Sequence, residues 1–201
     1  MSELTHTVLH AVGVKKHGSA AAVAALLGID TGEVERVLAA ALAAGRVNAV
    51  DGRYLLTPAG RMIVDTQYSR YCAAARADTA VLTAHARFEV VNNELKQLVT
   101  DWQTVTVGGC AIANDHADAA YDEQIIDRLG AVHDKVTPIL AALANALPRY
   151  ARYSVRLDHA LERAEAGAHA WVSDATQDSY HTVWFDLHED LLRVLGRTRV
   201  E

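Results

Sequence analysis

The sequence predicts a mainly α-helical protein, with an N-terminal winged helix-turn-helix that carries a short β-hairpin wing and a C-terminal antiparallel helical bundle. Three observations lead to this fold class. The chain is rich in alanine, the best helix former, and has only 3 Pro and 12 Gly in 201 residues. Strand-like segments around an Asp-Gly pair interrupt the helical pattern at residues 47–57. Apolar residues then recur at heptad spacing along three later stretches.

The first 45 residues predict three helices: 4–16, a second helix that Ser19 caps and Gly28 ends, and 31–44. Asp30 and Glu33 form a D-x-x-E capping box at the start of the third helix. Apolar residues at positions i, i+3, i+4, i+7 and i+8 give this helix one predicted buried face. That face consists of Val34, Val37, Leu38, Ala41 and Leu42.

A β-hairpin and a long helix follow. The strands "VNAV" and "RYLLT" flank Asp51-Gly52, a dipeptide typical of tight hairpin turns. Thr57 and Pro58 then predict an N-cap with proline at the first helical position, beginning a helix that continues through residue 77. The order helix, helix, turn, helix, hairpin, helix indicates a winged helix-turn-helix domain over 1–65, followed by a bundle domain over 66–201.

The bundle domain is predicted to contain helices over 79–103, 118–147, 148–166 and 178–195. In three of them apolar residues are spaced alternately four and three apart, which is typical of left-handed bundle packing. These residues are Ala84, Phe88, Val91, Leu95, Leu98 and Trp102, then Ile125, Leu129, Val132, Val136, Ile139 and Leu143, then Tyr180, Trp184, Leu187, Leu191 and Val194. The segment 104–117, interrupted by Gly108-Gly109, is predicted to be a long loop.

Charge and cysteine usage limit the possible partners and compartments. The net charge of −6 argues against indiscriminate binding to polyanions, although residues 1–65 are neutral, with six basic and six acidic side chains. The start of the chain lacks a signal-peptide pattern, and no uncharged run is long enough to span a bilayer. Cys72 and Cys110 lie far apart without metal-type spacing. We therefore expect a cytoplasmic protein with free thiols, no membrane partner and no cofactor.

The segment "GRYLLTPAGR" (52–61), together with "VAALLGIDTGEVERVLAAALAAGRV" before it, resembles winged-helix regulators of the MarR and PadR type. The resemblance covers about the first 65 residues. It implies that helix 31–44 enters the major groove of duplex DNA and that Arg53 is the wing arginine. The same segment also resembles the dimerisation domain of small-molecule O-methyltransferases, which does not read DNA. No strand followed by a glycine-rich cofactor loop occurs after residue 65, so the chain is not such an enzyme.

The DNA-binding prediction depends on few cations. Helix 31–44 offers one arginine beside two carboxylates, Glu33 and Glu35, which phosphate would repel. A dimer would double the set, and specific contacts need only a few side chains at base edges. The predicted DNA-binding residues are Lys15, Lys16, Thr31, Arg36 and Arg53.

Polar residues beside the predicted bundle seams are candidates for a small anionic or polar effector. His85 and Glu89 lie one helical turn apart, and His181 and His188 border the last seam. A basic stripe on helix 148–166 suits carboxylates or phosphates, because guanidinium binds them in pairs. The predicted ligand-binding residues are His85, Glu89, Arg149, Arg152, Arg156, His181 and His188. The alternative is that these residues are structural, with the arginines paired to acids such as Asp122, Asp127, Asp186 and Asp190.

Metal and catalytic sites have weaker signals. The Glu-x-x-His pattern of carboxylate-bridged bundles is absent, and His181 and His188 are roughly 10 Å apart along a helix, too far to share one ion. No metal site is predicted. The stretch 114–123 brings together Asp115, His116, Asp118 and Asp122, in which an aspartate and the histidine could form a catalytic pair, but acids in this stretch also suit the start of a helix. No catalytic residue is predicted.

The sequence therefore predicts a dimeric transcriptional regulator, in which a ligand in the bundle changes the spacing of two recognition helices. The alternative is an accessory protein that binds a partner enzyme through the winged helix and the bundle. In that case "DSYHTVWFDLHEDLL" (178–192) is the candidate docking surface, with Tyr180, Trp184 and Phe185 as aromatic anchors. A metal-dependent or hydrolytic enzyme is a third interpretation without a defining motif.

Overall fold

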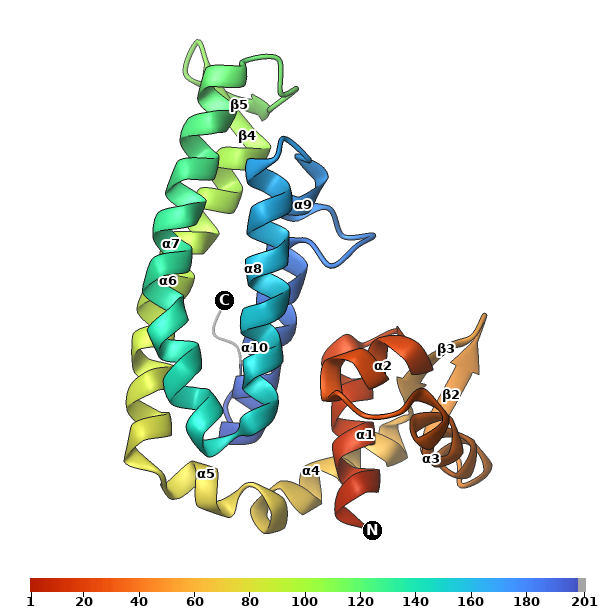
Figure 1. Ribbon diagram of the computed structural model, residues 1–201. Helices are drawn as coiled ribbons and strands as arrows, with labels where there is room; N and C mark the ends of the chain where they lie inside the picture. Colours follow the sequence, from red (N-terminus) through yellow and green to blue (C-terminus); the bar gives the residue numbers. More distant parts are fainter. Residues whose placement is uncertain (199–201) are drawn as a thin grey trace. The chain divides into compact units, whose positions relative to one another are not determined.

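The computed structural model describes residues 1–198, apart from the side chain of Val107, and the chain divides into two compact units (Figure 1). The first unit contains Met1–Asp78 and the chain from Asp186 onward, and the second contains Thr79–Phe185. The protein is mainly helical. A three-stranded antiparallel sheet lies in the first unit and a separate two-stranded hairpin in the second.

Three short helices begin the first unit: α1 (Glu3–Lys15), α2 (Ala20–Leu27) and α3 (Thr31–Ala43). Two begin at the caps that the sequence predicts. The Ser19 hydroxyl accepts a hydrogen bond from the third backbone N–H of α2, and the Asp30 carboxylate accepts one from the third N–H of α3, at 3.2 and 3.1 Å. These side chains satisfy amide groups that the helix itself leaves without acceptors.

The sheet of this unit has the strand order β1-β3-β2, with all pairs antiparallel. The strands are β1 (Gly18–Ser19), β2 (Val47–Val50) and β3 (Arg53–Leu56). Asp51 and Gly52, which join β2 to β3, have φ values of 48° and 72°. A two-residue turn with both φ values positive matches the right-handed twist of the strands, so the Asp-Gly prediction of a hairpin is confirmed.

The helix after the sheet is interrupted. The sequence predicts one continuous helix over 58–77, but the structure contains α4 (Pro58–Tyr71) and α5 (Ala73–Ala77). Cys72 separates them with φ −116° and ψ 9°, outside the helical region. The prediction of a continuous helix was wrong, because no proline or glycine marks this break in the sequence.

Gly60 lies in the first turn of α4 against the backbone of Arg46. The Thr57 hydroxyl accepts the Gly60 N–H at 2.9 Å, the cap that the sequence predicts. The Arg46 carbonyl accepts the Thr57 N–H at 3.0 Å. A Cβ on Gly60 would lie 1.8 Å from the Arg46 carbonyl oxygen. The glycine of "TPAGR" therefore allows α4 to begin directly against the residue that precedes β2.

The last helix, α10 (Tyr180–Leu195), contributes to both units, because the division falls between Phe185 and Asp186. Leu187, Leu191 and Val194 are fully buried. The sequence places the division between domains once, after residue 65. In the structure that residue lies inside α4, and the first unit is built from two separate parts of the chain.

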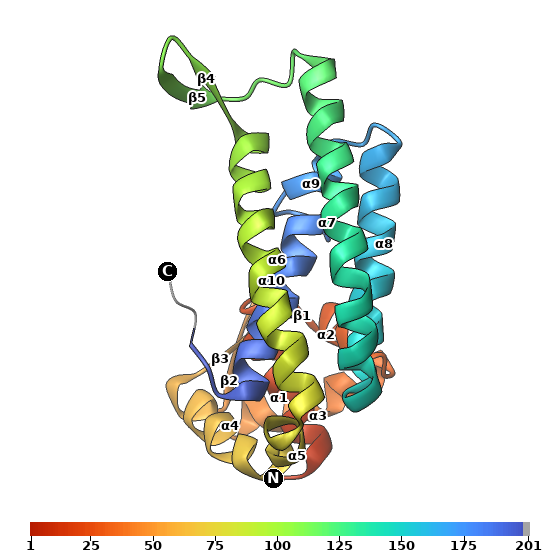
Figure 2. The same cartoon turned by 90° about the vertical axis from the view of Figure 1, so that its left-hand side faces the viewer.

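The second unit is a bundle of α6 (Thr79–Gln103), α7 (Ala119–Ala146), α8 (Ala151–Glu165) and the first part of α10. Both views show α6 and α7 side by side and antiparallel, with α8 returning along α7 (Figures 1 and 2). The short elements η1 (Pro148–Tyr150) and α9 (Ala170–Ser173) connect the long helices. Every residue of the two predicted seams on α6 and α7 is buried, so the heptad prediction is confirmed there.

The connection between α6 and α7 is not the unstructured loop that the sequence predicts. It contains β4 (Thr104–Val107) and β5 (Cys110–Ala113), joined by Gly108 and Gly109 with φ values of 60° and 83°. The hairpin lies at the end of the bundle (Figure 2). All four side chains of β5 are exposed. The sequence of β4 does alternate threonine and valine over its four residues, a signal that the prediction of a loop did not use, whereas β5 shows no alternation of polar and apolar residues.

Candidate functional site

The outer face of α3 combines a few polar side chains with small apolar ones. Thr31, Glu35 and Arg36 are exposed. Leu42 is 45% exposed, so its predicted place in the buried face of the helix was wrong. Its neighbours on this outer surface are Ala39, Ala40, Ala43 and Ala44, all exposed. The face that the sequence assigns to DNA therefore carries one guanidinium, one carboxylate and an apolar patch.

The tip of the β2–β3 hairpin provides a second exposed cation. Arg53 is exposed, and its Nη1 donates to the backbone carbonyl of His17 at 3.4 Å. Asp51 lies in the turn beside it, and Val50 is 58% exposed. The hairpin can thus offer a guanidinium to a phosphate, next to a carboxylate that weakens the attraction.

Lys15 and Lys16 differ sharply in their surroundings. The Lys15 ammonium lies 2.7 Å from the Asp186 carboxylate, and the two side chains are only 13% and 6% exposed. Lys16 ends α1 with φ 59° and is exposed. Of the five residues that the sequence assigns to DNA, Lys15 serves a partly buried ion pair inside the first unit, and the other four lie at the surface.

A buried polar network lies behind this surface, and no local sequence pattern indicates it. His10 Nδ1 lies 2.7 Å from the Tyr68 hydroxyl, and His10 Nε2 lies 3.0 Å from the Asp190 carboxylate. Burial raises the pKa of the Tyr68 phenol well above its usual value, and the charge of the nearby Arg193 offsets part of the rise. The residues come from α1, α4 and α10, so only the folded chain brings them together.

In the bundle, the predicted pair His85 and Glu89 does form. His85 Nε2 lies 3.3 Å from the Glu89 carboxylate, with the imidazole 3% exposed and the carboxylate side chain 37% exposed. Asn92, one turn further along α6, accepts a hydrogen bond from the Trp184 indole N–H at 3.0 Å. Phe88 stacks on the same indole with ring centroids 4.9 Å apart. These contacts fix α6 against α10 and fill the bundle interior.

The predicted arginine stripe begins in η1 and continues along α8, and it is only partly available to a ligand. Arg156 is paired with Asp178 at 3.0 Å, an acid other than those the sequence suggests as partners. Arg149 lies over the Tyr150 ring at 5.0 Å, and Arg152 is exposed. His181 is half-buried in the second unit, whereas the buried His188 belongs to the first. Within the predicted stripe, Arg156 is therefore engaged by an acid, whereas Arg152 lies open to solvent.

A cluster around Asp122 closes the hairpin end of the bundle. Asp122 is 1% exposed, and its carboxylate oxygens lie 3.0 and 3.1 Å from His116 Nδ1. The Asn114 amide donates to the same carboxylate at 3.2 Å, and His169 Nδ1 lies 3.6 Å away. The His116 ring lies over the Trp102 indole at 4.4 Å. Among the acids of the stretch 114–123 that the sequence offers as partners for His116, the one that contacts its imidazole is Asp122.

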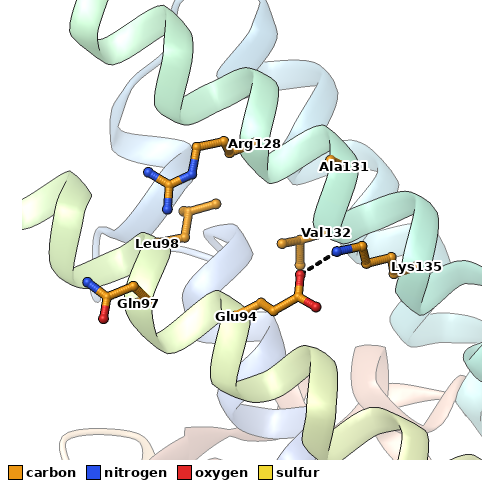
Figure 3. A pocket seen from close by; sticks show the side chains of 7 residues that line it. All are labelled: Glu94, Gln97, Leu98, Arg128, Ala131, Val132 and Lys135. Carbon is orange, nitrogen blue, oxygen red and sulfur yellow. Dashed lines mark hydrogen bonds and ion pairs between the residues drawn. The ribbon is translucent and has the colours of Figure 1, made fainter.

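A surface groove lies between α6 and α7, and Figure 3 shows the Glu94–Lys135 ion pair across it. Arg128 lies 2.8 Å from Asp101, and Lys135 lies 2.5 Å from Glu94. The small Ala131 leaves space between the pairs for a hollow of about 340 Å³. It is lined by Glu94, Gln97, Leu98, Arg128, Ala131, Val132 and Lys135. The α7 wall is basic and the α6 wall acidic, and no residue of this set was among the predicted ligand residues.

Comparisons with protein-family models, with curated proteins and with solved structures found no match to this chain. Within residues 1–198, no three His, Cys, Asp or Glu side chains are arranged to hold a metal ion. None of the helices in this part of the chain has the length and apolar character needed to cross a lipid bilayer. A function must therefore be inferred from the chain's own surfaces.

Proposed function

We propose that the first unit is a winged helix-turn-helix that binds duplex DNA, and that the protein is a dimeric transcriptional regulator. The observation that carries the proposal is the order of elements around the sheet. A helical pair, α2 and α3, is joined by a short turn and is followed by a β-hairpin whose second strand pairs with β1. In this arrangement α3 is the recognition helix and the β2–β3 hairpin is the wing.

The surface chemistry supports a modest DNA affinity. Thr31 and Arg36 on α3 are exposed and can reach base edges or phosphates, while Arg53 and Lys16 can contact the backbone on either side. Arginine at a guanine edge is the commonest specific contact in the major groove. The carboxylates of Glu33 and Glu35 weaken non-specific binding, so the affinity is expected to depend strongly on matching bases.

The bundle would supply dimerisation and effector binding. The groove between α6 and α7 presents Arg128 and Lys135 on one wall, which suits the carboxylate of a small polar effector. Both cations sit in solvent-accessible ion pairs that contribute little to stability, so a ligand can replace their partners at small cost. An effector regulates DNA binding only if it binds one arrangement of the dimer more tightly than the other.

A second candidate is an accessory protein that holds a partner through the same α3 face. The exposed Leu42 among exposed alanines favours this role, because an apolar surface is useless against phosphate but suits a protein interface. The engagement of Lys15 by Asp186 also removes one cation from the DNA-binding set.

Fluorescence anisotropy with labelled duplex DNA, of random sequence and from the region upstream of the gene, separates the two candidates. For the regulator we expect salt-dependent binding that prefers the upstream duplex. An Arg36→Ala/Arg53→Ala variant should bind more weakly, with the salt slope reduced by about 1 for each phosphate that the variant no longer neutralises. Arg87→Ala/Arg152→Ala, which removes two exposed arginines of the second unit, is the matched control. No binding at low salt would exclude the regulator and leave the accessory role.

A further inference from the structure

The β4–β5 hairpin is an exposed, uncharged element with no sheet to join. No Asp, Glu, Lys or Arg occurs between Asp101 and Asp115. Every side chain of β5 is exposed, including Ile112 at 49%. Natural proteins usually protect such edges with charges, proline or a covering element, and none of these is found on this hairpin in the described structure.

The base of the hairpin is held firmly. The Asn114 backbone N–H donates to the Gln103 carbonyl at 2.9 Å, and the Asn114 side-chain amide donates to the Trp102 carbonyl at 3.1 Å. The same amide donates to the buried Asp122 carboxylate. An isolated two-stranded hairpin is marginally stable in water. Here the network at its base holds the strands in an extended position beyond the helices.

The register of the hairpin shows which backbone groups point outward. Val107 pairs with Cys110 next to the turn, and Val105 pairs with Ile112. In a two-residue hairpin these residues exchange hydrogen bonds across the pair. The residues that alternate with these two pairs along each strand therefore direct their N–H and C=O groups away from the partner strand. On β5 the outward groups belong to Ala111 and Ala113, for which no backbone partner beyond the hairpin occurs among the described residues.

Electrostatics favours this hairpin as the place where two copies of the second unit can meet. Residues 79–185 contain eight Lys and Arg against fourteen Asp and Glu, a net charge of −6, which is the net charge of the whole chain. Most surfaces of two such units repel each other. The hairpin carries no charge, and an edge with equal numbers of donors and acceptors is complementary to its own copy under two-fold symmetry.

We propose that β5 pairs with β5 of a second copy, in antiparallel register, to form a four-stranded sheet across a two-fold axis. The register that pairs both outward residues joins Ala111 of each copy to Ala113 of the other. It places Ile112 opposite the partner's Ile112, in a pair without direct hydrogen bonds, where side chains approach most closely. The pairing buries two exposed isoleucines and gives hydrogen-bond partners to the outward N–H and C=O groups of both β5 strands.

This inference deepens the proposed function by naming the interface of the dimer. The two experiments that test this dimer interface contain no DNA. A protein that dimerises through β5 but binds no duplex would overturn the regulator alone, and a DNA-binding protein with another interface would overturn this inference alone.

The first test is sedimentation equilibrium of the full chain over a range of concentrations. We expect a monomer–dimer equilibrium that Ile112→Lys weakens roughly tenfold or more, because two like charges face each other across the axis. Val90→Lys is the matched control, since Val90 is a 63% exposed apolar residue on α6 of the same unit. A monomeric wild-type protein, or an Ile112→Lys protein that dimerises as the wild type does, would overturn the proposal.

The second test is disulfide trapping. In a Cys110→Ser background, Ile112→Cys should give an intermolecular disulfide under mild oxidation, because opposed residues of this type have Cα atoms about 4.5 Å apart. Wild-type Cys110 is exposed. In the proposed register it is displaced along the strand by four residues, about 13 Å, from Cys110 of the second copy. The two wild-type cysteines should therefore not cross-link. Efficient cross-linking through Cys110 in the wild type, or no cross-linking of the Ile112→Cys variant, would contradict the register.

Discussion

The role of Lys15 in the structure differs from the role that the sequence predicts for it. In the sequence it belongs to a basic cluster at the end of the first helix, and its predicted partner is phosphate. In the structure its ammonium lies 2.7 Å from Asp186, with both side chains largely buried. Asp186 lies 171 positions away, so no local pattern relates the two residues. The charge of the partner acid, rather than that of DNA, determines what this lysine does.

We expect Asp186→Asn to lower the free energy of unfolding by about 3 kcal/mol, because the substitution leaves a partly buried ammonium beside a neutral amide. Urea unfolding followed by circular dichroism measures the change. Lys16→Met, which alters the adjacent exposed lysine, should stay within about 0.5 kcal/mol of the wild type. Equal effects of the two substitutions would mean that the Lys15–Asp186 pair contributes nothing specific.

At the scale of elements, Gly60 gives a sharp prediction. Alanine is the better helix former by about 1 kcal/mol, so Gly60→Ala should stabilise α4 if only local propensity mattered. The new methyl carbon would lie 1.8 Å from the Arg46 carbonyl oxygen. Because this oxygen belongs to the backbone, it cannot move aside as easily as the end of a flexible side chain. We expect a net loss of at least about 2 kcal/mol. Gly130→Ala in α7, where the nearest atom to the new carbon is 3.9 Å away, should instead be neutral or stabilising. Thermal unfolding of both variants tests the contrast.

The elements that the sequence predicted are those with local or periodic signals. Caps at Ser19, Asp30 and Thr57 follow from side chains that accept the first amides of a helix, and the seams of α6 and α7 follow from burial every three to four residues. The break at Cys72 has no such signal. The β4–β5 hairpin was missed although β4 alternates threonine and valine, because that alternation covers only four residues and β5 has none. The double glycine was the one clue to its turn.

The candidate sites were harder to predict, because each combines residues from distant helices. His10, Tyr68 and Asp190 form one network although 180 positions separate the first from the last. The groove between α6 and α7 is lined by residues of both helices, so it becomes visible only when the register of the two helices is known. Pair spacing within one helix did identify His85 and Glu89 correctly as neighbours.

At the scale of the whole molecule, the first unit depends on the end of the chain. From Asp186 onward, α10 supplies the carboxylate for Lys15, the carboxylate for His10 and three fully buried apolar side chains, Leu187, Leu191 and Val194. Arg76 also donates to the Val194 carbonyl at 2.7 Å. The N-terminal part of the chain is thus completed by residues more than one hundred positions later.

Truncation after Phe185 tests this dependence. Fully burying a Leu or Val side chain contributes about 1.5–3 kcal/mol, and unpaired buried polar groups add to the loss, so the deletion removes a large part of the stability of a small unit. We expect amide hydrogen exchange of α1, α3 and α4 to approach unprotected rates in the truncated chain. The amides of α6 and α7 should stay protected, because most of their buried seam lies between these two helices and α8. Full protection of α1 in the truncated protein would mean that residues 1–78 fold alone, and DNA-binding tests could then use that fragment.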